Sequence, residues 1–232
     1  MEIQDAPATY LFKLWPWFEA NRIRIIWGGA VIVVAAGVIS FYSWHRDQNE
    51  IAAGMALTQV MRSIPRNATA SQQADFYLKI ATDYQGTTGG QRALLQGAAI
   101  LYAAGRYADA QAQFQKFLDT YPASFFAAQA ALGVATSLDA QGQATLAAGV
   151  YQRIINTYAD AVAVDSARYA LAQIDEHQGK FSEAANLYEA LVHYNPDGSL
   201  GSEARLRLME LKAKQPSALP STAPAIPSKP IH

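Results

Sequence analysis

The sequence contains no cysteine among its 232 residues. That absence excludes structural disulfides, thiolate metal sites, thiol nucleophiles and an N-terminal lipid anchor on cysteine. It does not identify a compartment, although a chain without thiols suits an oxidising one.

Clustered charge of one sign is also missing. The chain carries 18 lysine and arginine residues against 19 aspartate and glutamate residues, which gives a formal net charge of −1. A protein that grips nucleic acid through its phosphates needs a basic face, and no basic run is present. We therefore expect no nucleic-acid partner.

The motifs of catalysis and cofactor binding are absent as well. Gly86–Gly90 is rich in glycine, but no Lys-Ser or Lys-Thr pair follows it, so we interpret it as an ordinary connection. The adjacent Asp175 and Glu176 would point apart on a helix, which argues against an acid–base pair. No spacing typical of metal ligands joins the four histidines, which are His45, His177, His193 and His232. These absences predict a protein that is not an enzyme and has no metal, no cofactor and no small-molecule substrate.

One long uncharged run is present, the 20 residues Ile25–Trp44. A helix of this length reaches about 30 Å, the thickness of the hydrocarbon core of a bilayer. A buried core helix seldom runs so far without a charge. A cleaved signal peptide has a shorter apolar region, about 7–15 residues, and ends in small residues. This run ends in Phe41-Tyr42-Ser43-Trp44 instead, so the sequence predicts an uncleaved transmembrane helix over residues 25–44.

The basic residues near this run indicate its orientation. Lys13, Arg22 and Arg24 precede it, whereas only Arg46 follows closely. Basic residues favour the cytoplasmic side. We therefore predict a cytoplasmic tail over residues 1–24, a single span and a translocated C-terminal body. The aromatic segment 10–18 either lies along the membrane surface or is disordered.

A pattern with a period of 37 residues fills much of the remaining chain. Each copy has a small residue, a glycine, an alanine and an aromatic residue at fixed offsets: Ala98, Gly105, Ala110 and Phe114; Ala135, Gly142, Ala147 and Tyr151; Ala172, Gly179, Ala184 and Tyr188. Such periods indicate stacked supersecondary units. We interpret the glycine as the cap of a first helix, the alanines as helix-crossing points, and the aromatic residue as filling between units. The pattern predicts an all-α fold, an α-solenoid of helical hairpins.

The period also divides the chain. We predict a repeat domain over 45–214, with a divergent unit at 47–85, units at 91–122, 123–159 and 160–196, and a capping helix at 202–214. Ser71 is the expected N-cap of a helix that runs to Tyr84. Tyr121, Tyr158 and, with a slip of one residue in the period, Tyr194 are expected to pack at the ends of the units. Residues 215–232 contain five prolines and are predicted to be a disordered, extended tail.

The spacing resembles the tetratricopeptide repeat. The match consists of Ala110-x3-Phe114 with Pro122, Ala147-x3-Tyr151, and Ala184-x3-Tyr188 with Pro196. The chain departs from the pattern because its period is 37 rather than 34, the early Trp, Leu and Tyr are largely replaced, and Ala159 stands where proline is usual. The resemblance covers residues 91–196 well and 51–84 weakly.

The whole layout resembles a more specific family, the ancillary subunit of the SecYEG translocon. The resemblance rests on Trp17-Phe18-Glu19-Ala20-Asn21-Arg22 in a short tail, one span, and Tyr42-Ser43-Trp44-His45 leading into alanine-rich repeats. It implies a bacterial inner-membrane protein with a periplasmic repeat domain. Its implied partners are Sec translocon subunits and periplasmic chaperones that handle exported chains.

The resemblance to tetratricopeptide repeats also implies a groove lined by the first helix of each unit, on positions away from the packing stripe. Carried onto this sequence, it selects Arg92, Leu95, Tyr102, Gln129, Leu132, Thr136, Asp139, Tyr169, Gln173 and Glu176. A lining that mixes polar and apolar side chains suits an extended segment or a helix. The alternative is that these residues are merely exposed, or are covered by the capping helix.

Three functions compete on this evidence. The first is a membrane-anchored protein–protein interaction scaffold, ancillary to the Sec translocon and linking it to periplasmic chaperones. The second is a structural or assembly subunit of another envelope complex, in cell division or outer-membrane assembly. The third, an enzyme, lacks any catalytic constellation in the sequence.

Overall fold

A computed structural model describes residues 6–65, 67–158 and 161–214. The predicted proline-rich tail, residues 215–232, lies outside the described residues. The chain divides into two compact units, Met1–Met55 and Ala56–His232.

The first unit consists mainly of helix α1. This helix runs from Ala6 to Ser63, so its last residues belong to the second unit. The uncharged run 25–44 lies inside this helix, and its large apolar side chains, such as Ile32 and Phe41, are exposed. The stretch Glu19–Val60 is long and apolar enough to cross a membrane, with a mean hydropathy of 2.2 in its most apolar window. By length and composition, this helix is a candidate for a membrane span or a signal sequence.

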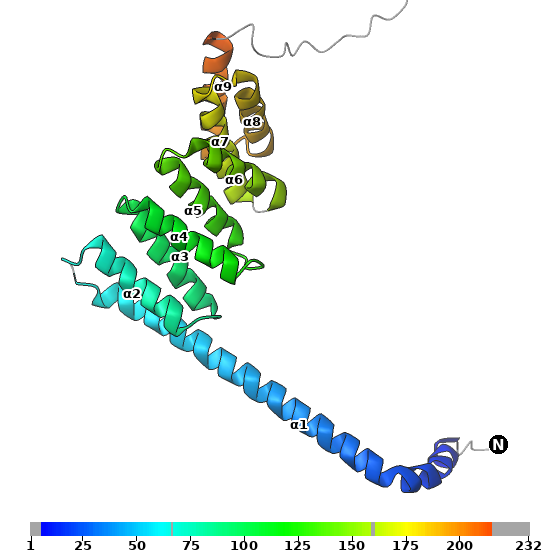
Figure 1. Cartoon of the computed structure of the whole chain (residues 1–232). Helices are drawn as coiled ribbons and strands as arrows, with labels where there is room; N and C mark the ends of the chain where they lie inside the picture. The colour runs from blue at the N-terminus through cyan, green and yellow to red at the C-terminus, as the bar shows by residue number, and fades with distance from the viewer. Residues whose placement is uncertain (1–5, 66, 159–160, 215–232) are drawn as a thin grey trace, which may run out of the picture. The chain divides into compact units, whose positions relative to one another are not determined.

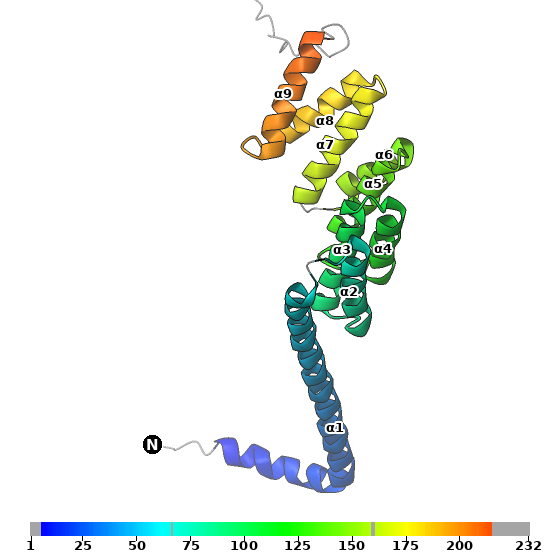
Figure 2. The same cartoon turned by 90° about the vertical axis from the view of Figure 1, so that its left-hand side faces the viewer.

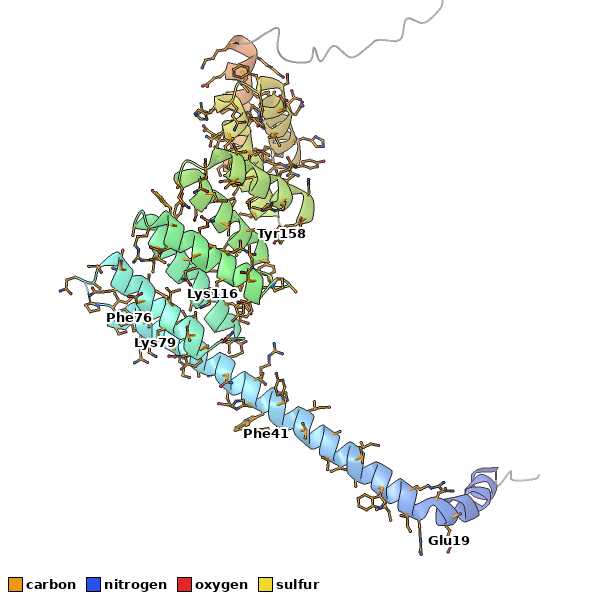
Figure 3. The ribbon with its side chains drawn as sticks, in the orientation of Figure 1. Glu19, Phe41, Phe76, Lys79, Lys116 and Tyr158 are labelled. Atoms are coloured by element: carbon orange, nitrogen blue, oxygen red, sulfur yellow. The ribbon has the colours of Figure 1, made fainter. Side chains whose placement is uncertain are left out.

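The N-terminal end of α1 bends away from the rest of the helix (Figure 1), and Glu19 is labelled beside the bend in Figure 3. Pro16 lies one turn earlier. Proline has no N–H to donate and its ring clashes with the preceding turn, which is the commonest cause of a sharp helix kink. The backbone of residues 10–18 is therefore helical but not collinear with the apolar run.

The second unit is a stack of helices in which each contacts the next from α2 onward. Figure 2 shows the same succession from a second direction. The helices are α2 (Ala70–Asp83), α3 (Thr88–Ala103), α4 (Tyr107–Thr120), α5 (Ala127–Ala140), α6 (Ala144–Thr157), α7 (Ala161–His177), α8 (Phe181–Tyr194) and α9 (Ser199–Lys214). No strand occurs in residues 6–65, 67–158 or 161–214. The predicted all-α stack of helical hairpins is confirmed.

The repeated glycine ends the first helix of each pair through the same backbone motif. Gly105, Gly142 and Gly179 have φ angles of 76°, 74° and 75°, in the left-handed region that glycine enters without a steric penalty. The N–H of the residue after each glycine bonds back to the fifth carbonyl before it, at 2.9, 3.0 and 2.8 Å. These bonds form a Schellman motif, which satisfies carbonyls left free at the helix end.

The other repeated positions form the core, as the period predicts. The six alanines at the helix crossings (Ala98, Ala135, Ala172, Ala110, Ala147 and Ala184) are all 0 % exposed, so neighbouring backbones approach closely. The aromatic residues Phe114, Tyr151 and Tyr188 are also buried. The buried residues form two clusters: α7 supplies Leu171 and Ile174 to the first and Ala172 to the second, and Leu187 packs against both.

The last helix, α9, closes the stack. Ala204 and Leu211 are buried with the side chains of α8, while Arg205 and Lys212 are exposed, and Lys212 pairs with Glu189 of α8 at 3.2 Å. Met209 stands 37 residues after the buried Ala172, yet it is 60 % exposed. This arrangement is typical of a terminal repeat with a polar outer surface.

Two local predictions at the ends of α2 and α3 are wrong. The N-cap of α2 is Thr69 rather than Ser71, because Thr69 and Gln72 form a reciprocal capping box of 3.3 and 2.9 Å. The segment Gly86–Gly90 is not wholly a loop, since α3 begins at Thr88. A side chain on Gly90 would collide with the carbonyl of Tyr84, so this glycine serves close packing within a helix.

The expected packing of Tyr194 is also wrong. Tyr121 and Tyr158 are half-buried at the ends of their units, but Tyr194 is 69 % exposed. The period does not slip here: Asn195 takes the place of the tyrosine and donates to the Asp165 carboxylate at 3.1 Å.

Candidate partner groove

Each hairpin has a first helix (α3, α5 or α7) and a second helix (α4, α6 or α8). The first helices of successive hairpins lie closer together than the second helices do. α3 contacts α5, α5 contacts α7, and α7 contacts α9. Within the part of the chain that the structure describes, no comparable contact joins α4 to α6 or α6 to α8. A stack that is tighter on one side curves toward that side, as solenoid repeats do, so α3, α5, α7 and α9 line the inner face.

The ten predicted groove residues all lie on α3, α5 and α7. They fall into rows 37 residues apart, so that Leu95, Leu132 and Tyr169 form one row and Tyr102, Asp139 and Glu176 form another. Arg92 with Gln129, and Thr136 with Gln173, occupy two further rows. The structure therefore brings equivalent positions of adjacent first helices side by side.

These residues differ in how far a partner could reach them. Arg92, Gln129 and Asp139 are exposed. Six more are half-buried: Tyr102, Leu132, Thr136, Tyr169, Gln173 and Glu176. Leu95 is only 6 % exposed and belongs to the core, so it supports the groove from beneath rather than lining its surface.

Glu176 is tied to the core beneath the groove. The buried Tyr188 on α8 donates from its hydroxyl to the Glu176 carboxylate at 2.7 Å. Burial and this hydrogen bond to an acceptor raise the pKa of Tyr188 above its usual value of 10.0. One oxygen of Glu176 is therefore held toward the core, and the side chain is positioned rather than free to turn.

The preceding unit has Asp139 at the position of Glu176 and Tyr151 at the position of Tyr188. Burial, and then the charge of Asp139, raise the pKa of Tyr151. The same two causes, together with the neighbouring Tyr107, raise the pKa of Tyr102, whose ring centroid lies 5.2 Å from that of Tyr107. Neutral tyrosines thus flank an acidic residue in two successive units.

Helix α9 extends the rows beyond the predicted residues. Glu203, Leu206 and Glu210 stand 37 residues after Ser166, Tyr169 and Gln173. Tyr169 donates to Glu203 at 3.3 Å, which links α7 to α9 across the inner face. The 37-residue spacing could have identified these positions, but the prediction covered only the units that end at residue 196.

Charge is distributed unevenly along this inner face. Arg92 is the basic residue on α3, whereas Asp139, Glu176, Glu203 and Glu210 follow on α5, α7 and α9. Arg207 partly offsets the acidic end, with nitrogens 3.7 Å from Glu203 and 3.5 Å from Glu210. The groove thus becomes more acidic toward α9.

Comparison with known proteins identifies the architecture. Residues 16–148, more than half of the chain, match the family model of the tetratricopeptide repeat-like domain. No curated protein sequence matches the chain.

Two solved structures of MamA are similar in fold. MamA, residues 41 to the end, from Desulfovibrio magneticus RS-1 gives a TM-score of 0.53, and a MamA RS-1 double mutant named ArsTM gives 0.55. Each is 17 % identical in sequence, and each match covers 72 % of this chain and 86 % of the other. At this identity the likeness concerns the fold alone.

Proposed function

We propose that this chain, which belongs to the tetratricopeptide repeat-like domain family, is a membrane-anchored scaffold that binds proteins through the inner face of its helical stack. The observation that supports this most is the alignment of equivalent positions on α3, α5, α7 and α9. These helices present rows of polar and half-buried apolar side chains, the surface that an extended segment or a helix of a partner needs.

The preferred partner segment carries basic residues at one end. The acidic side chains on α5, α7 and α9 would pair with lysine or arginine, and the row Leu132–Tyr169 offers apolar contact beside them. Charge pairs of this kind orient a partner and raise its association rate more than they raise its affinity.

The apolar part of α1 serves as the anchor in this proposal. Residues 25–44 span the membrane, residues 1–24 remain in the cytoplasm, and residues 45–214 form a periplasmic domain of an inner-membrane protein. The support is the long exposed apolar surface of α1 together with the excess of basic residues before it.

The proposed partners are subunits of the Sec translocon and periplasmic chaperones. This part rests on the resemblance of residues 17–22 and 42–45, and of the layout around them, to the ancillary translocon subunits. A role as an assembly or structural subunit of a different envelope complex is the competing outcome, which the following experiment separates.

Site-specific photocrosslinking in native membranes tests the groove. A photoreactive amino acid would replace Thr136 on α5 in the full chain, and the matched control would replace the exposed Gln152 on α6, a second helix. We expect adducts with translocon subunits or periplasmic chaperones from position 136 and few from position 152. Equal labelling from both positions would refute the groove. Adducts confined to division or outer-membrane assembly proteins would refute the translocon assignment.

A charged substitution tests the anchor. Val34 lies near the centre of the run, where an arginine disfavours insertion by about 2.5–3.5 kcal/mol. Val34→Arg should therefore increase the fraction of the chain extracted from membranes by alkaline carbonate, while Val34→Leu should not. A wild-type chain that is already soluble after cell breakage would contradict the anchor.

A further inference from the structure

A cavity opens near the C-terminal end of the stack where the repeat pattern is broken. It encloses about 580 Å³, and Ile155, Tyr158 and Val164 contribute its apolar wall. Tyr158, at the C-terminal end of α6, is labelled in Figure 3. The volume falls in the range of pockets that bind small ligands or single large side chains.

The equivalent cavity two repeats earlier in the chain is much smaller. That cavity measures about 60 Å³, and four of its lining residues stand 74 residues before residues of the larger cavity. The corresponding pairs are Ala81 and Ile155, Leu94 and Arg168, Thr120 and Tyr194, and Tyr121 and Asn195. One difference between the two cavities is the last pair, because the Tyr121 ring packs edge-on against Phe117 with ring centroids 5.3 Å apart, whereas an asparagine has no ring.

The polar side of the larger cavity is built around a buried carboxylate. Asp165 is 5 % exposed, and it accepts a hydrogen bond from Arg168 and another from Asn195, both at 3.1 Å. A carboxylate has about four acceptor positions, so a further donor can still be accommodated. Since Arg168 balances the charge of Asp165, the cavity favours a neutral occupant over an ion.

The guanidinium of Arg168 also marks this cavity as a place for an aromatic ring. The Arg168 guanidinium carbon lies 5.2 Å from the centroid of the Tyr194 ring, and the exposed Tyr194 side chain lines the cavity. A guanidinium plane can stack on aromatic faces, so a second ring entering the cavity would find both an apolar wall and a stacking partner.

From these observations we propose that the cavity receives a tyrosine side chain of a partner protein. The guest ring enters the space beside Asn195, and its hydroxyl donates to Asp165. This site lies between α6, α7 and the end of α8 and uses none of the groove residues. It therefore does not depend on the inner-face function proposed above.

Methyl NMR of the full chain in detergent micelles tests the site with N-acetyl-L-tyrosinamide as the probe. The methyl groups of Ile155 and Val164 report on the cavity, and the methyl groups of the buried Ile80 on α2 serve as the internal control. We expect saturable shifts at Ile155 and Val164 only, with N-acetyl-L-phenylalaninamide binding at least threefold more weakly because it lacks the hydroxyl. Absence of saturation, or equal shifts at Ile80, would overturn the proposal.

Two variants make the test specific. Asn195→Tyr restores the repeat pattern and should weaken binding of the probe at least tenfold, whereas Gln152→Tyr adds a tyrosine on exposed α6 surface and should leave binding unchanged. Tyr194→Ala removes an exposed wall without disturbing the core, and should weaken binding at least threefold even if Asn195→Tyr does not fold. Undiminished binding in Tyr194→Ala would overturn the proposal. A failure here leaves crosslinking from position 136 unaffected, so the two proposals can be judged separately.

Discussion

The ring of Phe114 on α4 lies against the backbone of Gly133 on α5. A Cβ atom at position 133 would stand 2.6 Å from three atoms of that ring, closer than real carbon atoms approach. Phe114 is one of the aromatic residues that fill the gap between units, and it is buried. Gly133 thus allows α5 to pack directly on the aromatic residue of the preceding hairpin.

Gly133→Ala should therefore destabilise the repeat domain by about 1–2 kcal/mol, because overpacking at a buried site outweighs the gain of about 1 kcal/mol in helix propensity. Urea unfolding of the full chain in detergent, followed by circular dichroism, measures the change. Gly149→Ala is the matched control: nothing lies within 4 Å of that Cβ, so it should gain about 0.5–1 kcal/mol. A Gly133→Ala variant at least as stable as the wild type would contradict this contact.

The Schellman glycines give a second prediction. Gly142→Ala should lower the free energy of unfolding by about 1 kcal/mol, since an L-residue is strained at a φ of 74°. No atom lies within 4 Å of the added Cβ, so this loss reports on backbone conformation alone. Gly142→Asn should lose less, because asparagine enters the left-handed region more readily. Equal losses for both variants would argue against this explanation.

Ser137 on α5 should be dispensable for stability. It is 0 % exposed, and its hydroxyl has no hydrogen-bond partner among the described residues, whereas Ile100 and Ile174 hold the equivalent places. Ser137→Ala removes an unsatisfied buried hydroxyl and should raise the free energy of unfolding by about 1 kcal/mol. The neighbouring Thr136→Ala, whose hydroxyl donates to Gly133 at 3.2 Å, should give no comparable gain. A destabilised Ser137→Ala would show that the hydroxyl is satisfied.

Alkaline pH should unfold the domain through its buried tyrosines. The pKa values of Tyr151 and Tyr188 are raised in the folded state, chiefly by burial. Above pH 10 the unfolded chain loses the phenolic protons first, so stability is complete below that pH and falls above it by up to about 1.4 kcal/mol per pH unit for each tyrosine.

Tyr188→Phe should make this alkaline decline shallower, although it loses the hydrogen bond to Glu176 and about 1–2 kcal/mol at neutral pH. Urea midpoints measured across the alkaline range compare the two chains, with Tyr194→Phe at an exposed position of α8 as the control. A decline as steep in Tyr188→Phe as in the wild type would exclude Tyr188 from this titration.

The periodic part of the fold could be predicted from the sequence because each repeated residue type satisfies one structural requirement. Glycine at the left-handed position, alanine at a helix crossing and an aromatic residue between hairpins recur at identical offsets, and the structure places all three as expected. The same period identified first-helix rows, although it could not show that Leu95 lies in the core, because burial depends on how tightly neighbouring hairpins pack.

The errors arose where two residues could satisfy the same local requirement. Thr69 and Ser71 are both good N-caps, and only the reciprocal bond to Gln72 distinguishes them. Gly90 was interpreted as a loop residue because glycine permits turns, but its task is close approach to Tyr84. Tyr194 was expected to pack because it is the aromatic residue nearest the periodic position, whereas Asn195 occupies that position and lines the cavity.

Met209 stands where each earlier first helix places a buried alanine, and the basic side chains of Arg205 and Lys212 flank it. Surfaces that fit one another head to tail generate filaments when they do not close into rings. At this end a second molecule would have to cover two basic side chains, and it would meet the Met209 thioether at the position where the earlier units have an alanine methyl group. The exposed surface of α9 therefore disfavours head-to-tail association between copies of the chain.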